Sequence, residues 1–149
     1  MRVAGRNHGI SRRRPLNRDS IGEPVHVRCA LARWLSARLV ELIERDGLSA
    51  TCPWASRLPY EVQIAPVEPE QDGLRSELLA PALRLLAELV RRLHRLEGPV
   101  PLNAWLHDGP HWHLELVPRL SILAGLELGA GVYVNSLPPE EAAARLRAA

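Results

Sequence analysis

The chain has 149 residues, of which 46% are hydrophobic and 24% are charged, and its formal net charge is +2. This length predicts one domain, and this composition predicts a packed core and excludes a disordered or collagen-like chain. Because no apolar run is long enough to cross a bilayer and the N-terminus lacks the apolar segment of a secretory signal, we expect a cytoplasmic protein without membrane contact.

All 19 basic residues are arginine. The absence of lysine from the sequence excludes Schiff-base chemistry and a phosphate-loop lysine within this chain. The two cysteines, Cys29 and Cys52, form neither a disulfide framework nor a Cys-x-x-Cys zinc motif, and two reduced thiols agree with a cytoplasmic location.

The first 28 residues differ from the rest in charge. Residues 1–28 hold seven arginines against two acids, a net charge of +5, whereas residues 29–149 hold twelve arginines against fifteen acids, a net charge of −3. Residues 1–28 have no apolar period, which predicts a flexible Arg-rich arm before a domain at 29–149. Arg12-Arg13-Arg14 is either a phosphate contact or part of a solvated tail, and the lack of aromatic residues in the arm argues against nucleic acid.

A hairpin is predicted where the domain begins. The apolar spacing from Cys29 to Glu44 is locally helical, yet residues 38–44 also alternate in part, and Asp46-Gly47 is a strong turn signal. We therefore expect a short helical or irregular lead-in, and then strands at 38–44 and 48–52. The clearest following strand is 60–65, which lies between two prolines.

The longest helical pattern covers Leu74–Leu96, where leucines recur on one stripe with arginines largely off it. Pro81 lies inside this pattern, so the regular helix either begins near Pro81 or is kinked there. Gly98-Pro99 ends the helix. His94 lies beside the stripe and is interpreted as an ordinary surface histidine.

The remaining chain predicts three strands and a helix. Strands at 102–107 and 111–117 flank a turn at residues 108–110, and a Gly-interrupted apolar run predicts a strand at 126–134. Residues 138–149 begin with two prolines and two acids and predict a C-terminal helix. We expect all the strands to form one mostly antiparallel sheet with the long helix on one face.

A histidine cluster carries the chemistry. Alternate side chains of a strand share a face, so His111, His113 and Glu115 point to one side and the apolar residues between them to the other. With His107 reached across the turn, three imidazoles can close on a divalent ion such as zinc or iron, and Glu115, a partner carboxylate or water can complete the four ligands. Two alternatives stay open. His113 is a nucleophile for phosphorus, its second nitrogen held by a backbone carbonyl, or the cluster is only a polar strand face.

Several segments together resemble a known family. They cover about residues 37–149 in order, and the similarity is to the C-terminal half of galactose-1-phosphate uridylyltransferase-like proteins of the histidine-triad superfamily. The segments that carry the resemblance are Cys52–Val62, Asn103–His107, His111–Leu120, Ala124–Asn135 and Pro138–Ala143.

The resemblance implies an α+β half-barrel of the histidine-triad type, an antiparallel sheet with one long helix across it and a short C-terminal helix. It also favours a hairpin over a helix for Arg38–Cys52. It implies that His107, His111 and His113 are metal ligands, with a fourth carboxylate ligand from the N-terminal half of the family. Leu126–Asn135 matches a part that helps to form the hexose pocket.

Two acidic residues are candidates for substrate binding, Glu115 and Glu127, although Glu127 stands where some family members have a lysine. The family's nucleophile motif, His-Pro-His, belongs to its N-terminal half, and His8 and His26 of this chain are isolated. The resemblance thus predicts a metal-binding, nucleotide-sugar-binding domain of a UDP-glucose–hexose-1-phosphate uridylyltransferase-like protein of galactose metabolism, without its own nucleophile.

Its ligand would be a nucleotide sugar or sugar phosphate. Open sheet edges predict a homodimer or a partner chain that carries the N-terminal half. The alternatives are a stand-alone histidine-triad nucleotide hydrolase or transferase that uses His113, and a non-catalytic binding domain.

Overall fold

The computed structural model describes residues 40–149. The expectations for the Arg-rich arm at 1–28, for the lead-in from Cys29 and for the first two residues of the strand at 38–44 lie outside this described part of the chain.

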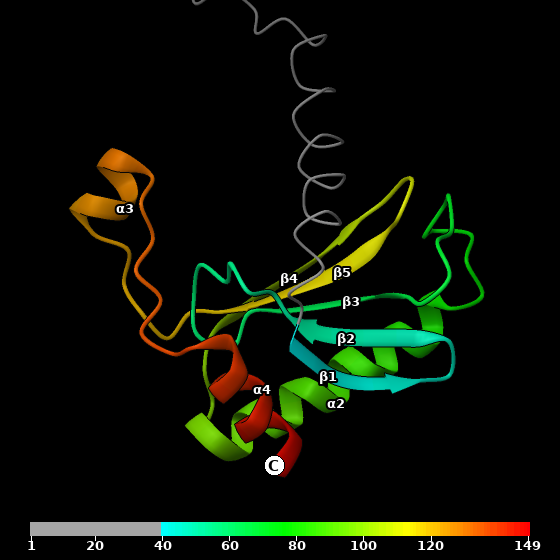
Figure 1. Cartoon of the computed structure of the whole chain (residues 1–149), viewed down its shortest axis with the longest axis horizontal. Helices are drawn as coiled ribbons and strands as arrows, with labels where there is room; N and C mark the ends of the chain where they lie inside the picture. The colour runs from blue at the N-terminus through cyan, green and yellow to red at the C-terminus, as the bar shows by residue number, and fades with distance from the viewer. Residues whose placement is uncertain (1–39) are drawn as a thin grey trace, which may run out of the picture.

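Five strands form one antiparallel sheet in the order β1-β2-β3-β5-β4, which Figure 1 shows as a twisted layer. The antiparallel sheet that the sequence predicts is confirmed. The strands are β1 (Val40–Arg45), β2 (Leu48–Cys52), β3 (Val62–Pro66), β4 (Leu102–His107) and β5 (His113–Pro118).

The hairpin of β1 and β2 turns at Asp46 and Gly47, whose φ angles are 52° and 75°. Two positive φ angles in a two-residue loop match the twist of the flanking strands, which explains the Asp-Gly pair. Within the described residues the hairpin prediction is confirmed against the local helical period. A bulge in β1 between Glu41 and Ile43 turns Leu42 into the core.

The long helix α2 (Leu79–Glu97) crosses one face of the sheet and buries Ala82, Leu85, Leu89 and Leu93. It begins five residues later than the predicted Leu74. Pro81 lies in its first turn, where a missing N–H breaks no helical hydrogen bond, so this proline lies at the start of the helix. Gly98 ends the helix with a φ of 77°.

The predicted C-terminal helix is present as α4 (Pro139–Ala148), which packs on β1 and β2 beside α2. Its buried face joins α2 and the apolar side of the sheet in one core. The acids in its first turn and the arginines in its last turn suit the helix dipole. No helix in residues 40–149 is both long and apolar enough to cross a membrane.

The strand predicted at Leu126–Val134 is wrong. This segment instead contains the short helix α3 (Gly125–Ala130), followed by residues without regular structure, and it projects from the body of the molecule. Its apolar residues alternate, but none of them is buried in α3 and no strand pairs with them. Gly131 ends α3 in the left-handed conformation, with a φ of 66°. We call residues 119–136 the lobe.

Candidate functional site

The two sides of β5 face different surroundings. Leu114 and Leu116 enter the core under α2, whereas His113 and Glu115 point to the opposite face, on which no described helix packs. The strand register continues this polar face across the sheet, because Glu115 pairs with Gln63 on β3 and with Trp105 on β4. The face assignment predicted from the period of two is confirmed for these residues.

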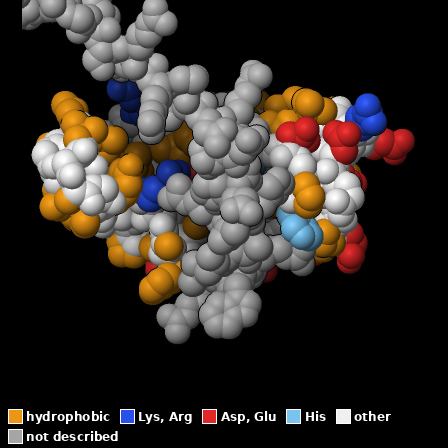
Figure 2. All heavy atoms as spheres, turned by 90° about the horizontal axis from the view of Figure 1, so that it is seen from above, with side chains coloured by type: hydrophobic (Ala, Val, Ile, Leu, Met, Phe, Trp, Pro, Cys, Tyr) orange, Lys and Arg blue, Asp and Glu red, His pale blue; other side chains and the backbone are white. Residues whose placement is uncertain are grey.

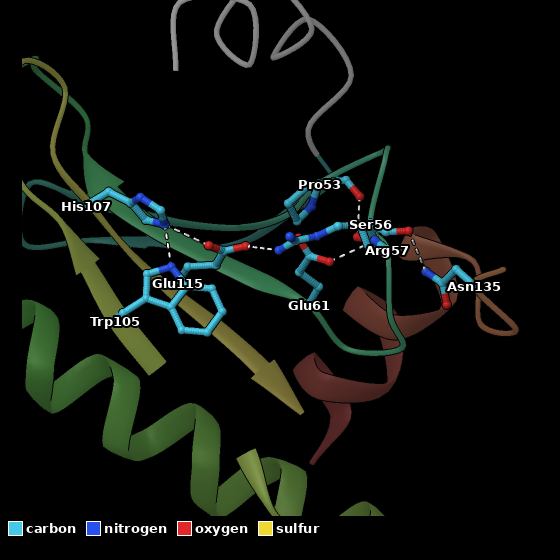
Figure 3. A network of polar contacts seen from close by, with 8 residues as sticks. All are labelled: Pro53, Ser56, Arg57, Glu61, Trp105, His107, Glu115 and Asn135. Atoms are coloured by element: carbon cyan, nitrogen blue, oxygen red, sulfur yellow. Dashed lines mark hydrogen bonds and ion pairs between the residues drawn. The ribbon is translucent and has the colours of Figure 1, made fainter. Parts of the chain in front are cut away.

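A buried carboxylate lies at the centre of the polar face. Glu115 is 6% exposed and forms an ion pair with Arg57, which lies in the loop between β2 and β3. Arg57 also binds Glu61 through a backbone hydrogen bond of 2.8 Å and a side-chain contact of 3.3 Å. One guanidinium thus holds two buried carboxylates, as Figure 3 shows.

Burial and charge shift the pKa values in this network. Burial alone would lower the pKa of Arg57, but Glu61 and Glu115 raise it above its usual value. Burial raises the pKa of Glu61, and the charge of Arg57 and its hydrogen bonds oppose this increase. Arg57 therefore stays charged and compensates carboxylates that water hardly reaches.

His107 connects this network to the edge strand. Its Nε2 atom lies 2.8 Å from Oε2 of Glu115 and 2.5 Å from Nε1 of Trp105. One nitrogen of a neutral imidazole either donates to the carboxylate or accepts from the indole N–H, but not both. His107 is thus positioned by two competing partners on the same face (Figure 3).

His113 stacks on His107 with ring centroids 4.5 Å apart and an interplanar angle of 16°. Its Nδ1 atom lies 3.3 Å from the carbonyl oxygen of His111. Burial lowers the pKa of His113, although the His111 carbonyl acts against this shift. Since a neutral ring that donates from Nδ1 leaves the Nε2 lone pair available, His113 suits either a metal ligand or a nucleophile.

His111 lies in the turn and has a φ of 65°, which is rare for a residue with a side chain. Its N–H donates to the carbonyl of Glu70 at 2.9 Å, and the carboxylate of Glu70 accepts from the indole of Trp112 at 2.9 Å. Asp108 accepts from the backbone N–H of Gly73 at 2.8 Å. The loop that follows β3 therefore holds the turn between β4 and β5.

The predicted metal ligands are only partly brought together. His107 and His113 lie side by side with Glu115, and this donor set has the chemistry that zinc and iron bind. Within residues 40–149, however, no three His, Cys, Asp or Glu side chains are grouped closely enough to hold an ion. The chemistry of the residues fits a metal, but the described structure does not bring the full predicted ligand set together.

Glu127 lies apart from this network, on α3 of the lobe. Its carboxylate accepts from the backbone N–H of Ala124 at 3.0 Å, and this hydrogen bond lowers its pKa. The lobe rejoins the body at Asn135, which donates to the carbonyl of Ser56 at 3.2 Å next to Arg57. Glu127 thus caps a helix, and its predicted role in substrate binding stays a prediction.

Sequence reasoning missed three residues of the network, Arg57, Glu61 and Trp105. Trp105 lies two residues before His107 on a predicted strand, so the period of two already placed both on one face. Arg57 carries a weaker signal, a Glu four residues later in a loop, and its pairing with Glu115 joins residues 58 positions apart. Cys52 is buried, which raises the pKa of its thiol to about 12 and leaves it protonated.

No protein-family model matches the chain. An ADP-glucose phosphorylase from Arabidopsis thaliana is 28% identical in an alignment 136 residues long, which covers 80% of this chain and 38% of that protein. The solved structure of a uridylyltransferase is 27% identical with a TM-score of 0.66, and the match covers 82% of this chain and 44% of that one. The chain thus spans about two fifths of the length of these relatives.

Two further solved structures share the fold at lower identity. An ADP-glucose phosphorylase from Arabidopsis thaliana with bound ADP-glucose has a TM-score of 0.71 at 24% identity and covers 80% of this chain and 42% of its own. A zinc-bound histidine triad family protein from Mycobacterium smegmatis has a TM-score of 0.58 at 20% identity, with coverages of 82% and 90%.

The sheet, the helix across it and these likenesses define a protein with the histidine-triad fold. In sequence as well as fold, the chain is similar to an ADP-glucose phosphorylase and to a uridylyltransferase. The resemblance that the sequence indicates is confirmed over about 80% of the chain.

Proposed function

We propose that this chain is the nucleotide-sugar-binding domain of a uridylyltransferase-like or phosphorylase-like enzyme. The observation that carries this proposal is the polar face, where His113 stacks on His107 beside the buried pair of Arg57 and Glu115. A structural neighbour with bound ADP-glucose has the same fold. The sequence contains no His-Pro-His motif, so in this proposal the nucleophile comes from another polypeptide segment.

Binding of nucleotide sugars tests this proposal. We expect UDP-glucose or ADP-glucose to bind the full chain in titration calorimetry, and His113→Ala to weaken this binding because the ring faces the proposed site. His94→Ala, on the surface of α2, is the matched control and should bind as the wild type does. Equal binding by His113→Ala and wild type, or no binding of either nucleotide sugar, would contradict the proposal.

A second candidate function uses His113 itself as the nucleophile. The contact between its Nδ1 and the His111 carbonyl favours this candidate, because it leaves Nε2 available for attack. Nε2 would form a bond to the α-phosphorus, the bond from that phosphorus to the bridging oxygen would break, and the sugar phosphate would leave with the electron pair. Mass spectrometry should then find a nucleotidyl group on His113 after incubation with a nucleotide sugar. An unmodified His113 under these conditions rejects this candidate.

The proposal includes a metal, zinc or iron, held by His107 and His113 with Glu115 and with His111 as the predicted third imidazole. A zinc-bound neighbour with this fold supports it. A bound divalent ion would supply positive charge on the polar face. Since an imidazole must be neutral to bind, affinity should decrease as the pH falls below about 6.5.

Elemental analysis and melting temperature test the metal. We expect about one equivalent in protein purified without chelators, most of it lost in His107→Ala, His111→Ala or His113→Ala and kept in His94→Ala. Less than about a tenth of an equivalent, together with no change of the melting temperature in added zinc, would reject the metal.

A partner chain is part of the proposal. Among the described strands, β4 has an open edge, while Arg147 of α4 donates to the carbonyl of Glu41 on β1. The lobe exposes a group of apolar side chains, which Figure 2 shows gathered at one end of the molecule. This group consists of Leu120, Ile122, Leu123, Leu126, Leu128, Val132, Tyr133 and Val134.

Light scattering measures the mass of the assembly and so distinguishes a homodimer from a complex with a partner chain. Ile122 and Leu128 are 94% and 74% exposed, so Ile122→Asp/Leu128→Asp should keep the melting temperature and lose the dimer. Leu74→Asp, at a residue 68% exposed outside the lobe, should stay dimeric. A wild-type chain that is monomeric alone and forms a complex when the N-terminal half is added supports the partner chain. A wild-type chain that stays monomeric and binds no partner contradicts both the homodimer and the partner chain.

A further inference from the structure

A cavity of about 320 Å³ lies away from the polar face, between the turn of β1 and β2 and the outer side of α2. Three arginines line it, Arg45 from β1 and Arg84 and Arg91 from α2. The sheet separates it from His113 and Glu115, because α2 packs on the opposite side of β5. A ligand bound on the polar face would therefore not contact these three arginines.

The lining of the cavity holds three arginines against two acids, Asp46 and Glu88. Glu88 binds Arg45, which contributes most to lowering the pKa of this carboxyl, and it binds Arg92 at 2.8 Å. The Glu88 carboxylate is therefore already paired with two arginines, Arg45 and Arg92. Arg84 and Arg91 form no ion pair or hydrogen bond with any other residue in the described part of the chain.

The positions of these two arginines suit one anionic ligand. They are seven residues apart on α2, so they lie on the same side of the helix and about 10 Å apart along its axis. Leu48 and Leu85, which are only 1% and 2% exposed, also line the cavity and give part of its wall an apolar character. Guanidinium groups beside apolar side chains match a phosphate group that carries a compact organic body.

We propose that this cavity is a second anion site, which binds the phosphomonoester of a small molecule. Its volume lies at the lower end of ordinary ligand sites, which are about 300–1,000 Å³. This size favours a small phosphorylated metabolite over an extended acidic peptide. The site is independent of the nucleotide-sugar site on the polar face.

Titration calorimetry with AMP, inorganic phosphate and adenosine tests the site on the full chain. We expect AMP to bind, adenosine not to bind, and inorganic phosphate to bind more weakly than AMP because it lacks the body that contacts the wall. Arg84→Gln/Arg91→Gln should weaken AMP binding by about tenfold or more, since two charge-assisted contacts are lost. Both side chains are exposed, so the variant should keep its melting temperature.

Two control variants test whether AMP binds at this cavity rather than elsewhere on the chain. Arg75→Gln removes an arginine that is 89% exposed outside the cavity, and His113→Ala alters the polar face; both should bind AMP at the cavity as the wild type does. AMP binding that persists in Arg84→Gln/Arg91→Gln, or that is lost in His113→Ala, overturns the proposal. It is also overturned if millimolar AMP gives no heat, or if only an acidic peptide binds.

Discussion

The two faces of the sheet are made by the same strands but are stabilised in different ways. On the face under α2 and α4, Leu114 and Leu116 alternate along β5 into a core of packed apolar side chains. On the other face, the intervening Glu115 is just as buried, yet a charged partner, Arg57, stabilises it. The period of two thus places an apolar core and a charged network on opposite sides of one strand.

The difference separates stability from function. Packing on the core face lowers the free energy of the folded chain through burial of apolar surface. Buried ion pairs contribute little net stability, because desolvation offsets their attraction, whereas the loss of one partner leaves an uncompensated buried charge. Changes to each face should therefore have distinct signatures.

The largest effect is expected on the core face. Leu93 of α2 is 1% exposed, and Leu93→Ala should lower the free energy of unfolding by about 2–5 kcal/mol through lost burial and a cavity. Leu83→Ala is the matched control, since Leu83 lies on the same helix and is 48% exposed, and it should cost less than about 0.5 kcal/mol. Urea unfolding measures both, and equal losses would contradict the assignment of faces.

A smaller effect is expected when the charged network is broken. Arg57→Met leaves Glu61 and Glu115 without their cation, and should cost about 1–3 kcal/mol at neutral pH. This is less than for a fully buried pair, because the Arg57 side chain is 40% exposed and water screens it. Arg75→Met, at an exposed arginine, is the control and should cost almost nothing.

The pH dependence sharpens this prediction. The pKa of Glu61 is already raised above 4.5 in the folded chain, so its contribution to stability is fully present below 4.5 and lost as the pH rises through its folded pKa. Removing Arg57 raises this pKa further. The difference between wild type and Arg57→Met should therefore shrink as the pH falls towards 4.5. A difference that grows towards acid pH would show that Arg57 does not compensate these carboxylates.

The sequence predicts the core face better than the polar face. Periods of two and 3.6 located the strands and α2, because apolar burial leaves a regular pattern along the chain. The pattern fails at the lobe, where alternating apolar residues such as Leu126 and Leu128 are exposed and have no neighbouring strand. Burial in another chain and burial in a sheet produce the same alternation, so the sequence alone does not distinguish them.

The candidate site was predictable where it lies on one strand pair. His113, Glu115 and His107 share a face by spacing alone, and the structure places them together. The partner of Glu115 was not predictable, because Arg57 comes from a distant loop whose position depends on the whole fold. The left-handed backbone of His111 was not predictable either, because it accompanies a hydrogen bond from its N–H to Glu70 after β3.

The smallest effect concerns the protonation of His113 on the polar face. Burial lowers the pKa of His113 below 6.5, so the folded chain binds fewer protons than the unfolded chain at mildly acidic pH. Its contribution to stability is therefore present above pH 6.5 and is lost as the pH falls through the folded pKa. His113→Gln removes the titrating ring, so its stability should vary less between neutral and mildly acidic pH than that of the wild type, whereas Leu83→Ala should keep the wild-type dependence. A ring-proton NMR titration gives the pKa directly, and a value above 6.5 would contradict the effect of burial on this ring.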